Sequence, residues 1–147
     1  MKKNTFKTVT KNIFLSLTVL LAMVSFTSCA KKVAFQTSTI VPAARGDVKI
    51  KKDENKNYII KIELENLAEI SRIEPSRNVY VVWLETDESS VKNIGQIDSD
   101  SNFLSSKLKA SFETVTSFTP KKIFITAEEN ADVQYPGMPL IMETNKF

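Results

Sequence analysis

Apolar and polar residues alternate with a period of two along much of the chain. Ile60, Ile62 and Leu64, for example, alternate with charged residues, which is the pattern of a strand with one buried face. The continuous apolar run 80–84 predicts a central strand that is covered on both faces. Strands are predicted around residues 48–50, 60–64, 80–84, 107–113, 122–126 and 140–142. This spacing predicts an all-β fold, an antiparallel β-sandwich of about seven or eight strands, with an open barrel as the alternative.

Polar and Pro/Gly-containing segments separate these strands. Residues 53–57 are typical of a hairpin tip, and residues 66–73 have room for one short helical turn before Pro75. Residues 135–139 contain two prolines and a glycine and are expected to be irregular. Within this segment, Tyr135 is the candidate for an exposed aromatic residue that contacts a partner. A ring packed onto the sandwich, the commoner outcome for a loop aromatic, is the alternative.

The aromatic residues inside strands and near their ends are expected to fill the core. Trp83 lies in the most apolar run, so burial is expected rather than stacking on a ligand. Four phenylalanines are likewise expected in the sandwich interior: Phe103, Phe112, Phe118 and Phe124.

The N-terminal segment has a different pattern. Residues 1–12 are cationic and polar, and residues 13–26 form a 14-residue apolar run. This run matches the core of a secretory signal, roughly 7–15 residues, and is shorter than the ~20 residues that span a bilayer. Small polar residues follow it, directly before the single cysteine. The pattern predicts a cleaved signal peptide over residues 1–28.

The segment Phe26-Thr27-Ser28-Cys29 resembles a bacterial lipobox, of the looser kind found in Bacteroidetes-type lipoproteins. The resemblance implies that Cys29 becomes the first mature residue and carries a diacylglyceryl group, with acyl chains such as palmitate on the freed amine. An unmodified cysteine near an ordinary cleavage site is the alternative. Lysines rather than acids follow at Lys31 and Lys32, and the resemblance then implies the periplasmic side of the outer membrane, with surface exposure as the alternative. The expected organisation is a signal peptide (1–28), a lipidated tether (29–39) and a β-sandwich (40–147).

Composition and charge restrict the possible chemistry. The net charge is +3, but four lysines and no acid lie in residues 1–28, so the remaining chain is close to neutral. No nucleic-acid partner is expected from such a chain. The absence of histidine excludes histidine-based catalytic triads and histidine-ligated metals, and a single cysteine excludes an internal disulfide and thiolate zinc clusters.

One acidic segment resembles the start of a calcium loop. Asp98, Asp100 and Asn102 place oxygen ligands on alternate residues. Phe103 stands where an EF-hand has glycine and Lys109 where it has glutamate, which excludes an EF-hand. A weak surface calcium site and a polar turn remain the two interpretations. No arrangement of nucleophiles or paired carboxylates in the sequence points to a reaction. We therefore expect that the protein is not an enzyme and that it has no catalytic residue and no cofactor.

Two further stretches carry a family likeness. The run Tyr80-Val-Val-Trp-Leu84 followed by 91–97, and the run 118–128 followed by Val133-Gln-Tyr-Pro-Gly-Met-Pro139, resemble the C-terminal domain of anti-sigma-K factors. The resemblance implies an extracytoplasmic, immunoglobulin-like sandwich. In that family a cytoplasmic helical region binds the sigma factor, and this sequence has no counterpart of it, so sigma binding is not expected.

The sequence therefore predicts a membrane-anchored envelope lipoprotein that acts as a non-enzymatic binding or structural module. Its expected contacts are the membrane, through Cys29, and an envelope protein. Two alternatives remain open. One is an accessory sensor subunit of an anti-sigma or envelope stress system, and the other is a small calcium- or carbohydrate-binding module.

Overall fold

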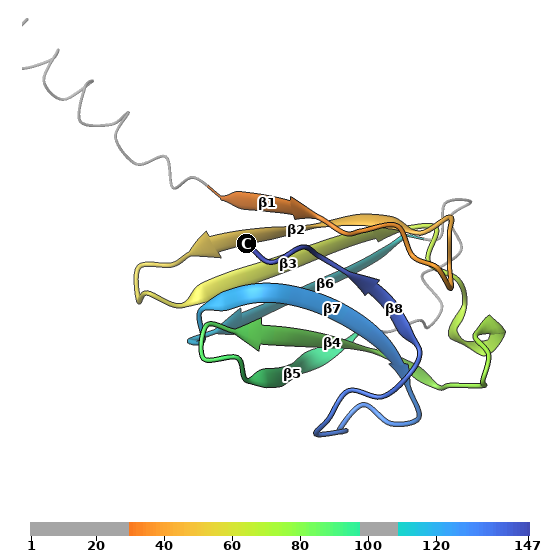
Figure 1. Ribbon diagram of the computed structural model, residues 1–147. Helices are drawn as coiled ribbons and strands as arrows, with labels where there is room; N and C mark the ends of the chain where they lie inside the picture. Colours follow the sequence, from red (N-terminus) through yellow and green to blue (C-terminus); the bar gives the residue numbers. More distant parts are fainter. Residues whose placement is uncertain (1–29, 98–108) are drawn as a thin grey trace, which may run out of the picture.

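Two antiparallel sheets make up the fold in the computed structural model, which describes residues 30–97 and 109–147 (Figure 1). The sheets have the strand orders β1-β2-β3-β6 and β5-β4-β7-β8. The strands of the described residues are β1 (Lys31–Ala34), β2 (Arg45–Lys52), β3 (Tyr58–Glu65), β4 (Val79–Thr86), β5 (Val91–Ile97), β6 (Ala110–Thr116), β7 (Pro120–Glu128) and β8 (Leu140–Glu143).

The strand order is that of an immunoglobulin-like sandwich with one added strand. Without β1, the sheets read β2-β3-β6 and β5-β4-β7-β8, which corresponds to strands A-B-E and C′-C-F-G of that architecture. The structure thus confirms the predicted antiparallel β-sandwich rather than the open barrel. Strand β1 extends the first sheet at its edge by pairing with β2, from Lys31 opposite Ile50 to Ala34 opposite Asp47.

The core lies between the two sheets and follows the predicted alternation. Ile60, Ile62 and Leu64 of β3 are at most 2% exposed, whereas the charged residues between them face outward. Tyr80, Val82 and Leu84 of β4 join the same apolar cluster from the second sheet. Burial of each such side chain stabilises the fold by about 1.5–3 kcal/mol.

Strand β4 is covered on both faces, as its continuous apolar run predicts. Val81 and Trp83 point away from the core cluster, yet both are 0% exposed. The connection from β7 to β8 lies over this outer face, where the Asn93 side-chain amide of β5 donates to the carbonyls of Ala131 and Val133 at 2.8 and 3.0 Å. Trp83 is therefore buried, as predicted, but outside the space between the sheets.

The predicted turns are also found. Asp53 closes the hairpin between β2 and β3, because its N–H donates to the Asn57 carbonyl at 2.8 Å and its carboxylate accepts from the Asn57 N–H at 2.7 Å. A single 3-10 turn, η2 (Ile70–Arg72), lies in the connection between β3 and β4.

Several expectations need correction. The sheet begins at Lys31, so four residues of the segment expected to be a tether belong to the sandwich. An interior position is wrong for Phe118, which is 46% exposed, and Phe124 lies on the outer face of β7, opposite Trp83. Phe112 does pack against the core cluster. Phe103 lies outside the described residues.

Candidate functional site

The outer face of the second sheet has an aromatic floor. Trp83 of β4 and Phe124 of β7 are direct neighbours in the antiparallel register, and their rings stack with centroids 6.2 Å apart and planes inclined by 13°. The indole Nε1–H donates to the Thr126 hydroxyl at 2.7 Å. This bond satisfies the polar atom of a ring that is otherwise surrounded by apolar groups.

A buried carboxylate links this floor to the β7–β8 loop, residues 129–139. The Thr126 hydroxyl donates to Oε1 of Glu128 at 2.5 Å, and the Gly137 N–H donates to the same oxygen at 2.7 Å. Glu128 is only 6% exposed. Since Thr126 and Glu128 are two residues apart on β7, their side chains share the outer face of the sheet.

Residue 137 must be small for this contact to form. A Cβ atom added at Gly137 would lie 2.6 Å from Oε2 of Glu128 and 3.4 Å from Cδ and Oε1. These separations are too short for a side chain at this position without movement of the carboxylate. Glycine thus allows the loop backbone to approach the buried acid.

Further bonds hold the β7–β8 loop in place. Arg77 donates to the Met138 carbonyl through Nε at 3.1 Å and through Nη2 at 2.9 Å, and the Asn78 amide donates to the Glu129 carbonyl at 3.0 Å. Together with the bonds from Asn93 and to Glu128, these contacts fix the loop at its beginning, middle and end. The loop backbone is therefore held by bonds from within the domain.

This ordered loop presents two large apolar side chains to solvent. Tyr135 is 82% exposed and Met138 is 69% exposed. Beside them, a cleft of about 270 Å³ lies between the loop and the outer face of β7 and β8. Its lining includes Phe124, Thr126, Gly137, Met138 and Leu140, with the Lys122–Glu143 ion pair at its edge. Such a surface can bury apolar area against a partner and can hydrogen-bond through the Tyr135 hydroxyl.

The predicted site residues fall into two groups. The structure places Tyr135 on the surface rather than packed onto the sandwich. Cys29, Asp98, Asp100 and Asn102 lie outside the described residues. Within residues 30–97 and 109–147, no group of three or more Asp, Glu, Cys or His side chains is placed to hold a metal ion. No helix formed by this same part of the chain is both long and apolar enough to cross a membrane.

Sequence reasoning missed Glu128 as part of the site. The predicted strand 122–126 ends before this residue, whereas β7 continues to Glu128. The available signal was the period of two, because Phe124, Thr126 and Glu128 fall on one face of a strand if the alternation is extended. Arg77 and Asn78 carried no local signal, since their partners are about 50–60 residues away in the sequence.

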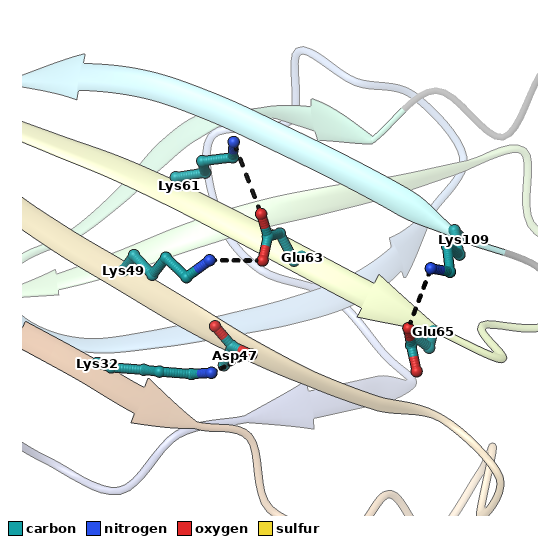
Figure 2. A network of polar contacts seen from close by, with 7 residues as sticks. All are labelled: Lys32, Asp47, Lys49, Lys61, Glu63, Glu65 and Lys109. Carbon is teal, nitrogen blue, oxygen red and sulfur yellow. Dashed lines mark hydrogen bonds and ion pairs between the residues drawn. The ribbon is translucent and has the colours of Figure 1, made fainter.

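A second polar cluster covers the outer face of the first sheet (Figure 2). Lys49 donates to Glu63 at 2.7 Å, and Lys61 lies 3.6 Å from the other oxygen of the same carboxylate. Lys32 pairs with Asp47 at 3.1 Å, and Lys109 pairs with Glu65 at 3.4 Å. These side chains come from β1, β2, β3 and the residue before β6, and every pair except Lys61–Glu63, which lies within β3, connects neighbouring strands.

The register explains why these pairs run diagonally. Lys49 lies directly opposite Lys61, and Asp47 lies directly opposite Glu63. Like charges in such positions repel, and the diagonal bond from Lys49 to Glu63 offsets this repulsion. The bond raises the pKa of Lys49 and lowers that of Glu63. Because the cluster is exposed to solvent, each pair contributes only a small amount of stability.

Comparisons with known proteins give no relative from which a role could be transferred. The chain matches no family model, and searches among curated proteins and solved structures found no match.

Proposed function

We propose that this protein is a lipid-anchored envelope protein that binds a partner protein through the β7–β8 loop and catalyses no reaction. The observation that carries this proposal is the exposure of Tyr135 and Met138, 82% and 69%, on a loop held by the buried Glu128. Single exposed apolar residues are common on protein surfaces. Two of them on one internally bonded loop, beside a cleft, are typical of a binding surface.

Pre-organisation of the loop favours binding. A mobile loop loses conformational freedom when it binds, which costs about 0.5–1.5 kcal/mol for each immobilised side chain in addition to the backbone. Here Glu128, Arg77 and Asn93 already hold the backbone from within the protein. Tyrosine and methionine are enriched in protein interfaces, so an envelope protein is the proposed partner.

The anchor belongs to the same proposal. Cys29 follows a signal-like segment and a lipobox-like sequence, and we propose that it carries the acyl chains. A stable anchor requires more than one chain, at about 0.8 kcal/mol for each buried methylene. The proposed location is the outer membrane, with the sandwich facing the periplasm.

The loop can be tested by site-specific photocrosslinking in intact cells. A benzophenone amino acid at Tyr135 should give a discrete crosslinked species. The same probe at Phe118, which is an exposed aromatic residue on the β6–β7 connection, is the matched control and should not give that species. Identical patterns from both positions, or no product from Tyr135, would contradict the proposed binding loop. A membrane-spanning regulator as the captured protein would instead favour the sensor alternative.

The anchor is tested separately. Mass spectrometry of the N-terminal peptide should show an acylated Cys29, and labelled palmitate should enter the wild-type chain but not the Cys29→Ser variant. An unmodified Cys29 in membrane fractions would refute lipid anchoring without affecting the test of the loop.

A further inference from the structure

The first strand begins two residues after Cys29. Extended backbone covers at most about 3.3–3.6 Å per residue, so Lys31 can lie only about 7 Å from an anchored Cys29. Strand β1 then pairs with β2 in the first sheet, and the Gln36 N–H donates to the Glu143 carbonyl of β8 in the second sheet at 2.8 Å. A lipid anchor at Cys29 would therefore hold the sandwich itself, close to the membrane.

The end of the sandwich nearest to Cys29, here called the proximal end, is formed by several segments. They are the start of β1, the β2–β3 hairpin, the β4–β5 turn, the start of β7 and the C-terminal residues (Figure 1). Contacts join them, since the Lys31 ammonium lies 5.1 Å from the centroid of the Phe147 ring and the Phe147 N–H donates to the Lys121 carbonyl at 2.9 Å. The β7–β8 loop lies at the opposite end (Figure 1).

The lysines that lack a carboxylate partner lie at one end of the sandwich. Four lysines form ion pairs on the outer face of the first sheet (Figure 2): Lys32, Lys49, Lys61 and Lys109. Two more form ion pairs in segments of the proximal end, Lys122 at the start of β7 and Lys146 among the C-terminal residues. The others have no carboxylate partner among the described residues, and all lie at the proximal end: Lys31, Lys51, Lys52, Lys56, Lys92 and Lys121.

The acids at this end do not balance these lysines. Asp53 uses its carboxylate to close the β2–β3 hairpin, and Glu54 lies at the tip of that hairpin. Asp87 and Glu88 lie on the β4–β5 turn, which belongs to the second sheet. The part of the proximal end formed by β1, the β2–β3 hairpin and the start of β7 is thus predominantly basic.

We propose that the proximal end rests against anionic phospholipid headgroups, with the lysines that lack a carboxylate partner as the contacts. This inference depends on the proposed lipid anchor at Cys29. The attraction of a lysine to an anionic surface falls off within a Debye length, about 8–10 Å, so only lysines held at the headgroups by the short connection gain from it. The contact directs the β7–β8 loop away from the membrane, toward a partner.

Lysine footprinting on vesicles tests this orientation. The acylated full-length mature protein is reconstituted into vesicles of phosphatidylcholine alone, or of phosphatidylcholine mixed with phosphatidylglycerol, and acetylated with a water-soluble ester. On the anionic vesicles, Lys51, Lys56 and Lys121 should react about fivefold more slowly, the change that corresponds to about 1 kcal/mol per contact. Lys61 and Lys109, on the outer face of the first sheet, should react equally on both vesicles. Equal rates at all sites would overturn the proposal.

A variant makes the test specific. Neutralisation of the hairpin by Lys51→Gln, Lys52→Gln and Lys56→Gln should remove most of the protection of Lys121. The control Arg72→Gln, an exposed cation near the other end, should leave it unchanged. Protection of Lys121 that survives the triple substitution would refute the role of the hairpin lysines.

The outcomes also separate this inference from the anchor. Acylated Cys29 with unprotected lysines refutes the lipid contact and leaves the anchor intact. An unmodified Cys29 refutes the anchor and this inference together. Protection in native membranes but not on protein-free anionic vesicles would assign the lysines to a protein partner and overturn the lipid contact.

Discussion

Replacement of Glu128 by alanine is the sharpest test of how the β7–β8 loop is held. The carboxylate is 6% exposed and accepts two bonds on one oxygen, from the Thr126 hydroxyl at 2.5 Å and from the Gly137 N–H at 2.7 Å. Alanine removes the acceptor and leaves both donors without it. The change therefore breaks the link between the aromatic floor of the second sheet and the exposed loop.

The expected loss follows from the two bonds. Hydrogen bonds to a charged group contribute about 1.5–3 kcal/mol each. The Gly137 N–H is only partly buried and can bind water instead, and removal of a buried carboxylate also removes its desolvation cost. Both effects reduce the total, so we expect the free energy of unfolding to fall by about 2–3 kcal/mol.

Urea denaturation followed by tryptophan fluorescence measures this loss directly, because Trp83 is the only tryptophan and stacks on the same face. The control is Glu129→Ala, at the next residue. Glu129 has 74% of its side chain exposed and pairs with Arg77 at 3.8 Å, so its removal should cost less than about 1 kcal/mol. Equal stabilities of the two variants would refute the structural role of Glu128.

Three further outcomes are expected from urea denaturation. Burial raises the pKa of Tyr80 above its ordinary value of 10.0. The Tyr80 hydroxyl therefore ionises at a lower pH in the unfolded chain than in the folded one, and the free energy of unfolding falls as the pH rises above 10. The Tyr80→Phe variant should show a smaller fall. Gly46→Ala should cost about 1–3 kcal/mol, because the added Cβ would lie 2.6 Å from the Glu63 carbonyl oxygen; unchanged stability would contradict that packing. The bond from Lys49 lowers the pKa of Glu63 below 4.5. The ionised Glu63 carboxylate therefore contributes to the free energy of unfolding above that pH, and this contribution is lost as the pH falls through the pKa of the folded state. The Glu63→Gln variant should lose less stability over the same pH range.

The strands that could be predicted are those whose side chains point alternately into the core and into solvent. Strand β3 is the clearest case, because its burial pattern follows its sequence pattern from Ile60 to Glu65. Strand β5 carried no such pattern. It pairs with β4 across an irregularity between Val82 and Trp83, and Gly95 has a φ of 135°, so its side chains do not alternate regularly between two environments.

Strand β1 was hidden for a different reason. Two lysines open it, and its place in the sheet depends on backbone bonds to β2 rather than on an apolar face. Backbone hydrogen bonding is available to every sequence except at proline, so an edge strand of this kind cannot be recognised from side chains. This is why a tether was expected where the sheet begins.

The irregular backbone of the β7–β8 loop was predictable, but the bonds that hold the loop were not. Proline and glycine at residues 136 and 137 exclude a regular strand, but they leave open whether the Tyr135 ring faces solvent or packs onto the sandwich. The order of the loop depends on Glu128, nine residues before Gly137, and on Arg77, which is 61 residues from Met138. These contacts form only after β4, β7 and β8 have come together.

The strand register determines which lysines meet a carboxylate, so a domain of neutral composition can still have a basic end. The described residues hold equal numbers of basic and acidic side chains. A lysine within a strand has neighbours on adjacent strands, so Lys49 can reach Glu63 diagonally although Lys61 lies directly opposite. A lysine at a strand end or in a hairpin, such as Lys51 or Lys56, has fewer cross-strand neighbours. Charge is therefore neutralised along the sheets and left unpaired at the end next to Cys29, where anionic headgroups could supply the missing partners.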